Sequence, residues 1–282
     1  VTIAEAAMLA GLPKAPSAYN PISNYKRARA RQLHIIDRME ENGFISTEEA
    51  ESARKQELKI RTSNDSTRVH AEYVAEMARQ LIFAQYGNEA YTRGLNVYTT
   101  LNATEQEAAY QALRQGIMNY ERRQHYRGPE KFVTLPANAQ DLEESIDDLL
   151  ADHPDNGDVL SAMVLEASPR RILAMRPSGE SIEITGEGLK PVQSGLSDKA
   201  PPNIKIRRGA VIRVVNTTKK TWEATQLPEV EGAFVAIDPR NGAIHALVGG
   251  FDFDKNKFNH VTQAWRQPGS SFKPFIYSAS LE

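Results

Sequence analysis

The residues best suited to chemistry lie near the end of the chain, in the stretch WRQPGSSFKPFIYSASLE, where a serine precedes a lysine by three positions. Ser270 could supply a nucleophilic hydroxyl, and Lys273 could accept its proton, which would suit the pair to nucleophilic catalysis. Residues three apart on a helix have Cβ atoms about 5 to 6 Å apart, so the amine can reach the hydroxyl. The spacing therefore predicts a serine nucleophile with a lysine base, provided that both residues lie on one helix.

The same spacing occurs three times in the chain, so the spacing alone is weak evidence. Ser23 with Lys26 follows a proline in a loop, where a serine commonly caps a helix. Ser52 with Lys55 lies in the charged segment TEEAESARKQE, which is typical of a solvated helix face. Neither pair has apolar neighbours that could alter the basicity of a lysine, so the third pair is the candidate.

Two prolines and a glycine mark out the third pair. Pro268 and Gly269 directly precede the serine, and Pro274 is tolerated only near a helix start, so we expect the helix to begin close to Ser270. A serine in the first turn lies near unpaired backbone N–H groups and the positive end of the helix dipole, which stabilise a developing oxyanion. Because a residue before a proline tends to avoid helical dihedrals, Lys273 must depart from that tendency.

Apolar residues surround the pair in the sequence: Phe272, Phe275, Ile276 and Tyr277. Burial of an ammonium group among apolar side chains lowers its pKa, and a lysine shifted in this way can take the proton of a serine. The catalytic interpretation therefore expects Lys273 to be buried. The alternative is a capped helix that carries an ordinary solvated lysine, and the residues alone leave both open.

Other clusters of polar residues give weaker signals. The acidic run at 141–158 lacks the ligand order of a calcium loop, and we expect a solvated linker there. Phosphate-binding loops of the GxGxxG and GxxxxGK types are absent, which argues against nucleotide chemistry. The histidines show no paired metal spacing, so no metal or other cofactor is predicted; they are His34, His70, His125, His153, His245 and His260.

A basic run in the first part of the chain has two interpretations. A solvated helix face is the more common one, although the run could face a diphosphate. Its members are Lys26, Arg27, Arg29 and Arg31.

The chain has 282 residues and a net charge of −2, so no global field points to nucleic acid or an anionic membrane as the main partner. It has no cysteine, which excludes disulfides and cysteine nucleophiles. No run approaches the roughly 20 apolar residues that cross a bilayer. The first residue is a valine and the last residues carry no helix breaker, so we expect a piece cut from a longer protein.

Helical patterns dominate the first 120 residues. The segment LNVYTTL at 95–101 is typical of a strand, and Asn102 is positioned to cap the helix that follows it. The other expected helices lie at 3–12, at 25–43, from 46 with a capping box of Ser46 and Glu49, and at 71–87.

The polar stretch at 121–157 breaks this pattern, and we place a domain boundary there. Five short β-rich runs follow, which is typical of a small five-stranded Greek-key barrel, although other small barrels fit the same pattern. Two apolar strands around the turn DPRNG, within 232–250, then predict a buried central hairpin. The expected domains are 1–60, 61–124, 125–227 and 228–282.

Several segments resemble the class A penicillin-binding proteins. GAFVAIDPRNGAIHALVGGFDF with RQPGSSFKPF resembles the start of their transpeptidase domain, AEAAMLAGLPKAPSAYNP with RARQLHIIDRM the end of their glycosyltransferase domain, and TTLNATEQEAA the linker between the two. A small barrel before the transpeptidase is typical of the 1A type of Gram-negative bacteria. The resemblance implies a multidomain α+β fold: a helical glycosyltransferase end, a linker, an OB-like barrel, and the start of a serine transpeptidase α/β domain.

The resemblance also implies roles for the candidate pair. Ser270 matches the acylated nucleophile and Lys273 its general-base partner, in an enzyme that transfers acyl groups between D-alanine stem peptides of peptidoglycan and is acylated by penicillins. The SxN and KTG motifs of the family would follow Glu282, so we expect the chain alone to be inactive. Gln32 stands where the family often has a second arginine, so Arg31 receives no catalytic role.

The resemblance implies partners and a location as well. They are peptidoglycan stem peptides, a lipid-linked disaccharide precursor, β-lactam antibiotics and a regulatory protein bound through the β-rich domain, at the periplasmic face of the inner membrane; nucleic acid is not expected. Two alternatives remain: a serine hydrolase of the β-lactamase kind, and a nonenzymatic docking module in which Ser270 is structural.

Overall fold

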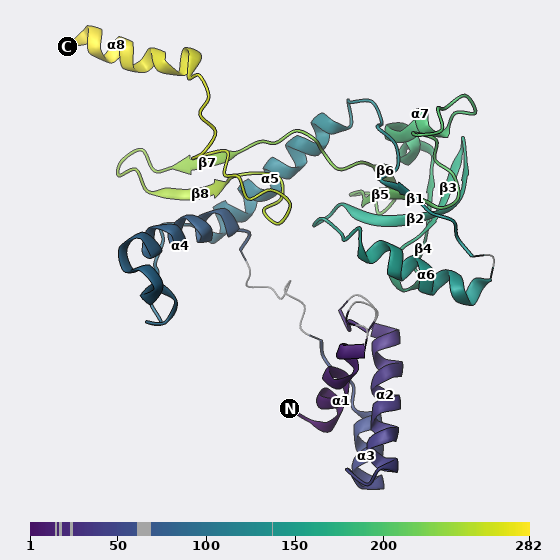
Figure 1. The fold of residues 1–282 in the computed structure, drawn as a ribbon. Coiled ribbons are helices and arrows are strands. Elements are labelled where there is room, and N and C mark those ends of the chain that lie inside the picture. The colour runs from purple at the N-terminus through teal and green to yellow at the C-terminus, as the bar shows by residue number, and fades with distance from the viewer. Residues whose placement is uncertain (15, 17–18, 23–24, 61–68, 137) are drawn as a thin grey trace. The chain divides into compact units, whose positions relative to one another are not determined.

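The computed structural model describes residues 1–14, 16, 19–22, 25–60, 69–136 and 138–282, and the chain divides into two compact units (Figure 1). One unit comprises Val1–Arg68 and Arg122–Leu227, and the other comprises Val69–Glu121 and Pro228–Glu282. Each unit is therefore built from two separate stretches of sequence, and the candidate pair lies in the second. The boundary expected at 61 lies outside the described residues.

Three helices form the first part of the chain, as predicted. Ser46 accepts a hydrogen bond from the backbone of Glu49, whose carboxylate accepts one from the backbone of Ser46, which confirms the capping box. The small residues Ala4, Ala7 and Ala50 let the helices approach closely around Ile36. The helices are α1 (Ile3–Gly11), α2 (Tyr25–Glu41) and α3 (Thr47–Lys55), with a 3-10 turn η1 (Leu12–Lys14) after α1.

The basic run on α2 is only partly solvated. Lys26 is exposed, but the Arg29 guanidinium donates to the side chain of Gln32 and to the carbonyl oxygen of Arg54. Gln32 is fully buried and donates through Nε2 to the carbonyl oxygen of Ala4, at 2.6 Å. The prediction of a purely solvated face is therefore wrong at Arg29, because that side chain ties α2 to α3.

The five strands predicted after residue 157 all form, and they belong to one antiparallel sheet. Strands are ordered β1-β5-β2-β3-β4, and β6 also pairs with β5. The strands are β1 (Lys131–Phe132), β2 (Leu160–Ser168), β3 (Arg171–Met175), β4 (Ser181–Thr185), β5 (Ala210–Asn216) and β6 (Trp222–Thr225).

Alternation of side chains gives this sheet an inner face. In β4, Ile182 and Ile184 are buried while their neighbours are exposed, and Ile172 of β3 pairs directly with Ile184. The turn η4 (Gly186–Val192) closes the gap beside β6, since a Cβ atom added to Gly188 would lie 2.2 Å from the carbonyl oxygen of Trp222. A short helix α7 (Gln193–Leu196) follows, and η3 (Pro177–Gly179) joins β3 to β4.

The solvated linker expected at 141–158 is wrong for most of that run, because residues Ala139–Ala151 form helix α6. Leu142, Ile146, Leu149 and Leu150 recur at the spacing of one helix face. Ile146 and Leu150 are 0% and 2% exposed and belong to one cluster with residues of β2 and β5. The acidic residues lie between these positions. The prediction of a linker was wrong because it relied on the many acidic residues and not on the helical spacing of the apolar ones.

In the second unit, helix α5 packs against a two-stranded sheet. Asn102 caps α5 through its Oδ1, which accepts the backbone N–H of Thr104 at 3.0 Å, as predicted. Gln106 of α5 is buried, and its amide exchanges hydrogen bonds with the backbone of Leu247. The elements are α4 (Glu72–Tyr86), η2 (Gly87–Tyr91), α5 (Ala103–Glu121), β7 (Phe234–Ile237), β8 (Ile244–Val248), η5 (Gly269–Phe272) and α8 (Lys273–Leu281).

Two expectations about strands in this unit are wrong. The segment 95–101 is not a strand, because its contacts with β8 amount to single hydrogen bonds, such as Thr100 Oγ1 to the carbonyl oxygen of Ile244 at 2.7 Å. The hairpin forms, but only β8 is buried: Val235 of β7 is 42% exposed and Ile237 54%. Within the described residues, β7 pairs with β8 alone, so its second edge is open.

Candidate active site

The candidate nucleophile lies in the first turn of a helix, as predicted. Gly269 has φ of +53°, a conformation that favours glycine, and it opens the 3-10 turn η5 that continues into α8. The backbone N–H of Lys273 bonds to the carbonyl oxygen of Ser270. Lys273 has φ −56° and ψ −41°, so it is helical although Pro274 follows it. Ser270 and Lys273 are thus placed one helical turn apart.

The burial expected for Lys273 is not found. Ser270 and Lys273 are both exposed, and Phe275 and Tyr277 are 68% and 61% exposed. Among the described residues, no helix or strand other than η5 packs against α8, which extends away from β7 and β8 in Figure 1. Water therefore reaches the whole helix, and the desolvation that would activate the lysine does not arise within this chain.

The candidate pair is not joined in this structure. In the part of the chain that the structure describes, no hydrogen bond links the Ser270 hydroxyl to the Lys273 ammonium, and no carboxylate lies within ion-pair distance of Lys273. The backbone thus places the serine and the lysine one helical turn apart, and both side chains are exposed.

The structure gives no support for a catalytic role of the other two serine–lysine pairs. Ser23 lies outside the described residues, and Ser52 and Lys55 are both exposed on α3, as predicted for a solvated face.

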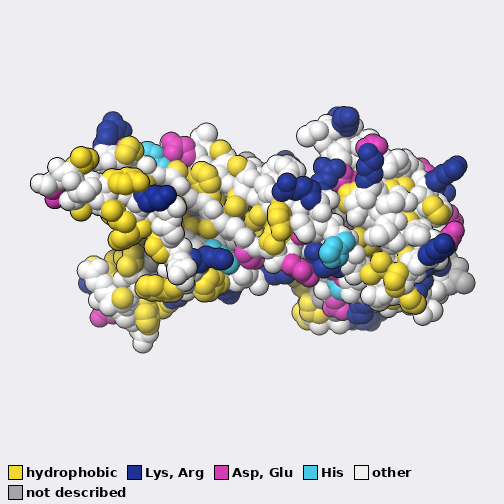
Figure 2. Space-filling model, turned by 90° about the horizontal axis from the view of Figure 1, so that it is seen from above, with side chains coloured by type: hydrophobic (Ala, Val, Ile, Leu, Met, Phe, Trp, Pro, Cys, Tyr) yellow, Lys and Arg dark blue, Asp and Glu magenta, His cyan; other side chains and the backbone are white. Residues whose placement is uncertain are grey.

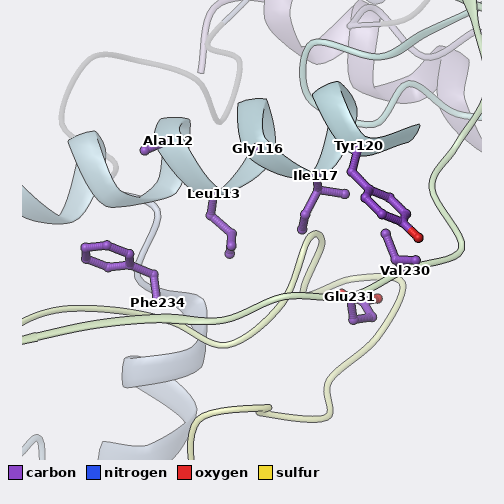
Figure 3. Close-up of a pocket in the computed structure, with 8 residues that line it drawn as sticks. All are labelled: Ala112, Leu113, Gly116, Ile117, Tyr120, Val230, Glu231 and Phe234. Carbon is purple, nitrogen blue, oxygen red and sulfur yellow. The ribbon is translucent and has the colours of Figure 1, made fainter. Parts of the chain in front are cut away.

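An apolar groove runs between α5 and β7, with a volume of about 430 Å³ (Figure 3). Leu113 and Ile117 point from α5 toward the segment that leads into β7, and Glu231 supplies a carboxylate in the lining. The groove suits apolar side chains of another segment better than a charged substrate. It is lined by Ala112, Leu113, Gly116, Ile117, Tyr120, Val230, Glu231 and Phe234, none of which belongs to the helix of the candidate pair.

Exposed apolar side chains are concentrated around these elements. Figure 2 shows them gathered over the part of the molecule that carries α4, β7 and α8. Phe234, Trp265 and Phe272 are among them, whereas residues 122–227, where the structure describes them, contain no exposed large apolar side chain.

Four histidines, His70, His153, His245 and His260, pair through a ring nitrogen with an acid or with the backbone. His70 Nδ1 lies 2.7 Å from a carboxylate oxygen of Glu107, and its ring stacks on Tyr110. His153 lies 2.8 Å from Glu130. Within the described residues, no group of three or more histidines and acids could hold a metal ion. No helix described here is both long and apolar enough to cross a bilayer.

Three family models match the chain in succession. A transglycosylase model matches residues 1–40, a penicillin-binding protein OB-like domain matches 126–230, and a penicillin-binding protein transpeptidase domain matches 232–282. The transpeptidase match therefore contains the candidate pair.

Whole proteins of one kind are similar over the full chain. Penicillin-binding protein 1A of Neisseria flavescens is 43% identical over 281 residues, which is 100% of this chain and 35% of that protein. Penicillin-binding protein 1A of Escherichia coli K12 is 37% identical, over 100% of this chain and 34% of its own length. The crystal structure of penicillin-binding protein 1A from Haemophilus influenzae matches with a TM-score of 0.70 and 32% identity, covering 100% of this chain and 40% of that one. The chain thus spans about a third of these curated relatives.

Proposed function

Because the chain belongs to the class A penicillin-binding proteins of the 1A type, we propose that it is part of a peptidoglycan synthase that crosslinks stem peptides through Ser270. The observation that carries the proposal is the position of Ser270 and Lys273 in the first turns of a helix inside the segment that matches the transpeptidase domain.

The proposed reaction is an acyl transfer in two steps. Oγ of Ser270 attacks the carbonyl carbon of the penultimate D-alanine, and its proton passes to Nζ of a neutral Lys273. The bond to the terminal D-alanine breaks, and the departing nitrogen takes that proton. An amine of a neighbouring strand then attacks the ester, gives up a proton, and restores the serine hydroxyl. A penicillin would acylate the same oxygen.

The proposed reaction also requires that other residues pack against α8. We expect that in the longer protein the apolar side chains of α8 pack against further parts of the transpeptidase domain, which would desolvate Lys273. One oxyanion donor would be the backbone N–H of Ser270, and a second would come from outside this chain. The exposure of Phe272 and Phe275 supports this proposal, since large apolar side chains at the surface mark an interface. The chain alone would then acylate poorly.

The first and middle parts of the chain have their own proposed roles. Residues 1–60 would end a glycosyltransferase domain that polymerises a lipid-linked disaccharide at the periplasmic face of the inner membrane, which the transglycosylase match to 1–40 supports. Residues 61–124 would form the linker region, and 125–227 an OB-like domain, which could bind a regulatory protein. With no exposed large apolar side chain among the described residues of 122–227, such a contact would be polar.

Mapping of the penicillin adduct tests the proposal. The longer protein is incubated with a penicillin, digested, and its acylated peptide identified by mass spectrometry, with and without the change Ser270→Ala. Ser271→Ala is the matched control, since both serines lie in η5 and both are exposed. We expect the adduct on Ser270, its loss in the first variant, and its retention in the second. An adduct on another residue would refute the assignment.

A further inference from the structure

The chain between β8 and the helix of the candidate pair closes on itself. Gly249, directly after β8, accepts through its carbonyl oxygen the backbone N–H of His260 at 2.9 Å, and Nδ1 of the same histidine lies 2.8 Å from that oxygen. Residues 249–260 therefore form a loop whose two ends meet at the end of β8. The segment that leads to Ser270 begins at this closure point, where His260 bonds to Gly249.

A buried asparagine organises the closure point. Asn259 is 6% exposed, and its Oδ1 accepts the backbone N–H of Val261 at 3.0 Å. Its carbonyl oxygen accepts the backbone N–H of Gln263 at 2.8 Å, and its own N–H donates to the side chain of Gln263 at 2.7 Å. Its Nδ2 donates to Sδ of Met77 on α4 at 3.3 Å. The backbone of Asn259 thus forms a turn over 259–263, and its side chain bonds within that turn and attaches it to α4.

Two glycines let α4 approach the loop. A Cβ atom added to Gly249 would lie 2.6 Å from both the Tyr73 ring and Asn259 Oδ1, and one added to Gly250 would lie 2.3 Å from the Tyr73 hydroxyl. Tyr73 is 5% exposed, and its hydroxyl donates to the carbonyl oxygen of Asn256 at 2.8 Å. No larger residue fits at either glycine without displacement of the tyrosine.

The start of the loop is held from two further elements. Arg114 of α5 donates to the carbonyl oxygen of Phe251 at 3.0 Å, and its guanidinium lies 4.0 Å from the centre of the Phe251 ring. Glu231, which precedes β7, accepts the backbone N–H of Phe251 at 2.9 Å. The loop is therefore fixed to α4, α5 and the approach to β7, all within the second unit.

The closure shortens the free connection to the nucleophile. Only residues 264–268 lie between the turn at 259–263 and Gly269, and five extended residues span at most about 18 Å. Without the turn, the last attachment before the nucleophile would be the bond of Tyr73 to Asn256, and the residues 257–268 that follow could span about 43 Å. The position of the turn therefore limits the positions that Ser270 can occupy.

We propose that Asn259 is a positioning residue for acyl transfer: by holding the turn at 259–263 onto α4, next to the bonds of His260 to Gly249, it fixes the point from which the segment carrying Ser270 leaves the sheet. The proposal rests on the proposed transpeptidase function, since without a reacting serine there is nothing to position.

The loop itself is tested in the 282-residue chain by amide hydrogen exchange. The change Asn259→Ala should raise the exchange of the Val261 amide about tenfold or more, since it removes the side-chain oxygen that accepts this N–H. Asn241→Ala is the matched control: Asn241 Oδ1 also accepts a backbone N–H two residues on, from Ala243 at 2.9 Å, but in the exposed turn of the hairpin. Unchanged exchange at Val261 in Asn259→Ala would overturn the proposal.

Positioning is tested in the longer protein with a fluorescent penicillin. We expect Asn259→Ala to lower the first-order acylation rate at saturating penicillin about 10- to 100-fold, with noncovalent binding and thermal unfolding changed far less. Asn259→Asp keeps an acceptor for the Val261 N–H and should recover much of the rate, and it serves also if the alanine variant unfolds. Asn241→Ala should acylate normally.

The outcomes separate the two proposals. An opened loop with an unchanged acylation rate would overturn the positioning role while leaving Ser270 as the nucleophile. A wild-type longer protein that forms no adduct on Ser270 would refute the proposed function and the positioning role with it.

Discussion

Residues 122–227 and residues 228–282 differ in how far their apolar side chains are buried. In the first region, Ile172 of β3 and Ile184 of β4 are 0% exposed. Apolar side chains of η4 and α6 pack in clusters with residues of the sheet. In the second, β8 is buried by α5, but β7 keeps an open edge and α8 has no covering element among the described residues. The first region completes a core from neighbouring sequence, whereas the second leaves large apolar side chains such as Phe272 and Phe275 exposed.

Truncation of the core should show this contrast most strongly. We expect Ile172→Ala to destabilise residues 122–227 by about 2 to 5 kcal/mol, because it leaves a cavity in a closed core. Phe275→Ala, on exposed α8, should change the free energy of unfolding of the same region by less than about 0.5 kcal/mol. Urea unfolding is followed by the fluorescence of Trp222, which packs on this core, in a Trp265→Phe background. Equal effects of the two changes would contradict the comparison.

Addition of a methyl group should have a smaller effect, of opposite sign in the first region and in α5, the helix that packs against β8 of the second region. Gly188→Ala places a Cβ atom 2.2 Å from the carbonyl oxygen of Trp222, so we expect it to cost about 1 to 3 kcal/mol. Gly116→Ala, in α5, meets nothing within 4 Å and should stabilise its helix by up to about 1 kcal/mol. Thermal unfolding of each variant measures both. A neutral Gly188→Ala would mean that η4 does not close the sheet against β6.

Acid should weaken the first region through a half-buried carboxylate. Burial alone would raise the pKa of Glu130, but hydrogen bonds and charge from Arg213 and His153 hold that pKa below its ordinary value of 4.5. A lowered folded-state pKa contributes stability above pH 4.5, and that stability is lost as the pH falls through the folded-state value. Urea unfolding between pH 6 and pH 3, followed by Trp222, should show this loss, and Glu130→Gln should flatten the profile. An unchanged slope in that variant would exclude Glu130 as the cause.

Local patterns in the sequence were sufficient for most elements. The capping box at Ser46, the Asn102 cap and the strand alternation at Ile182 and Ile184 all act between near neighbours, so the elements could be predicted without the fold. Helix α6 carried the same kind of signal, with apolar residues on one face at Leu142 and Ile146, but its acidic composition led to the wrong prediction of a linker.

Features that depend on contacts between residues far apart in the sequence could not be predicted. The exposure of Lys273 follows from the absence of any covering element on α8 within the described residues, and apolar neighbours in sequence do not reveal it. Asn259 was missed because its partners, Met77 and Gly249, lie on separate elements. The paired glycines at 249 and 250 were the available signal, since adjacent glycines after a strand mark a close approach of another chain segment.

The most direct test of the account is a side-by-side labelling of the 282-residue chain and the longer protein with fluorescent penicillin. If the start of the transpeptidase domain is incomplete within this chain, the longer protein should be labelled rapidly at Ser270, and the chain should remain unlabelled over the same period. Rapid labelling of Ser270 in the chain alone would contradict the account, because an exposed serine and lysine would then suffice for acylation.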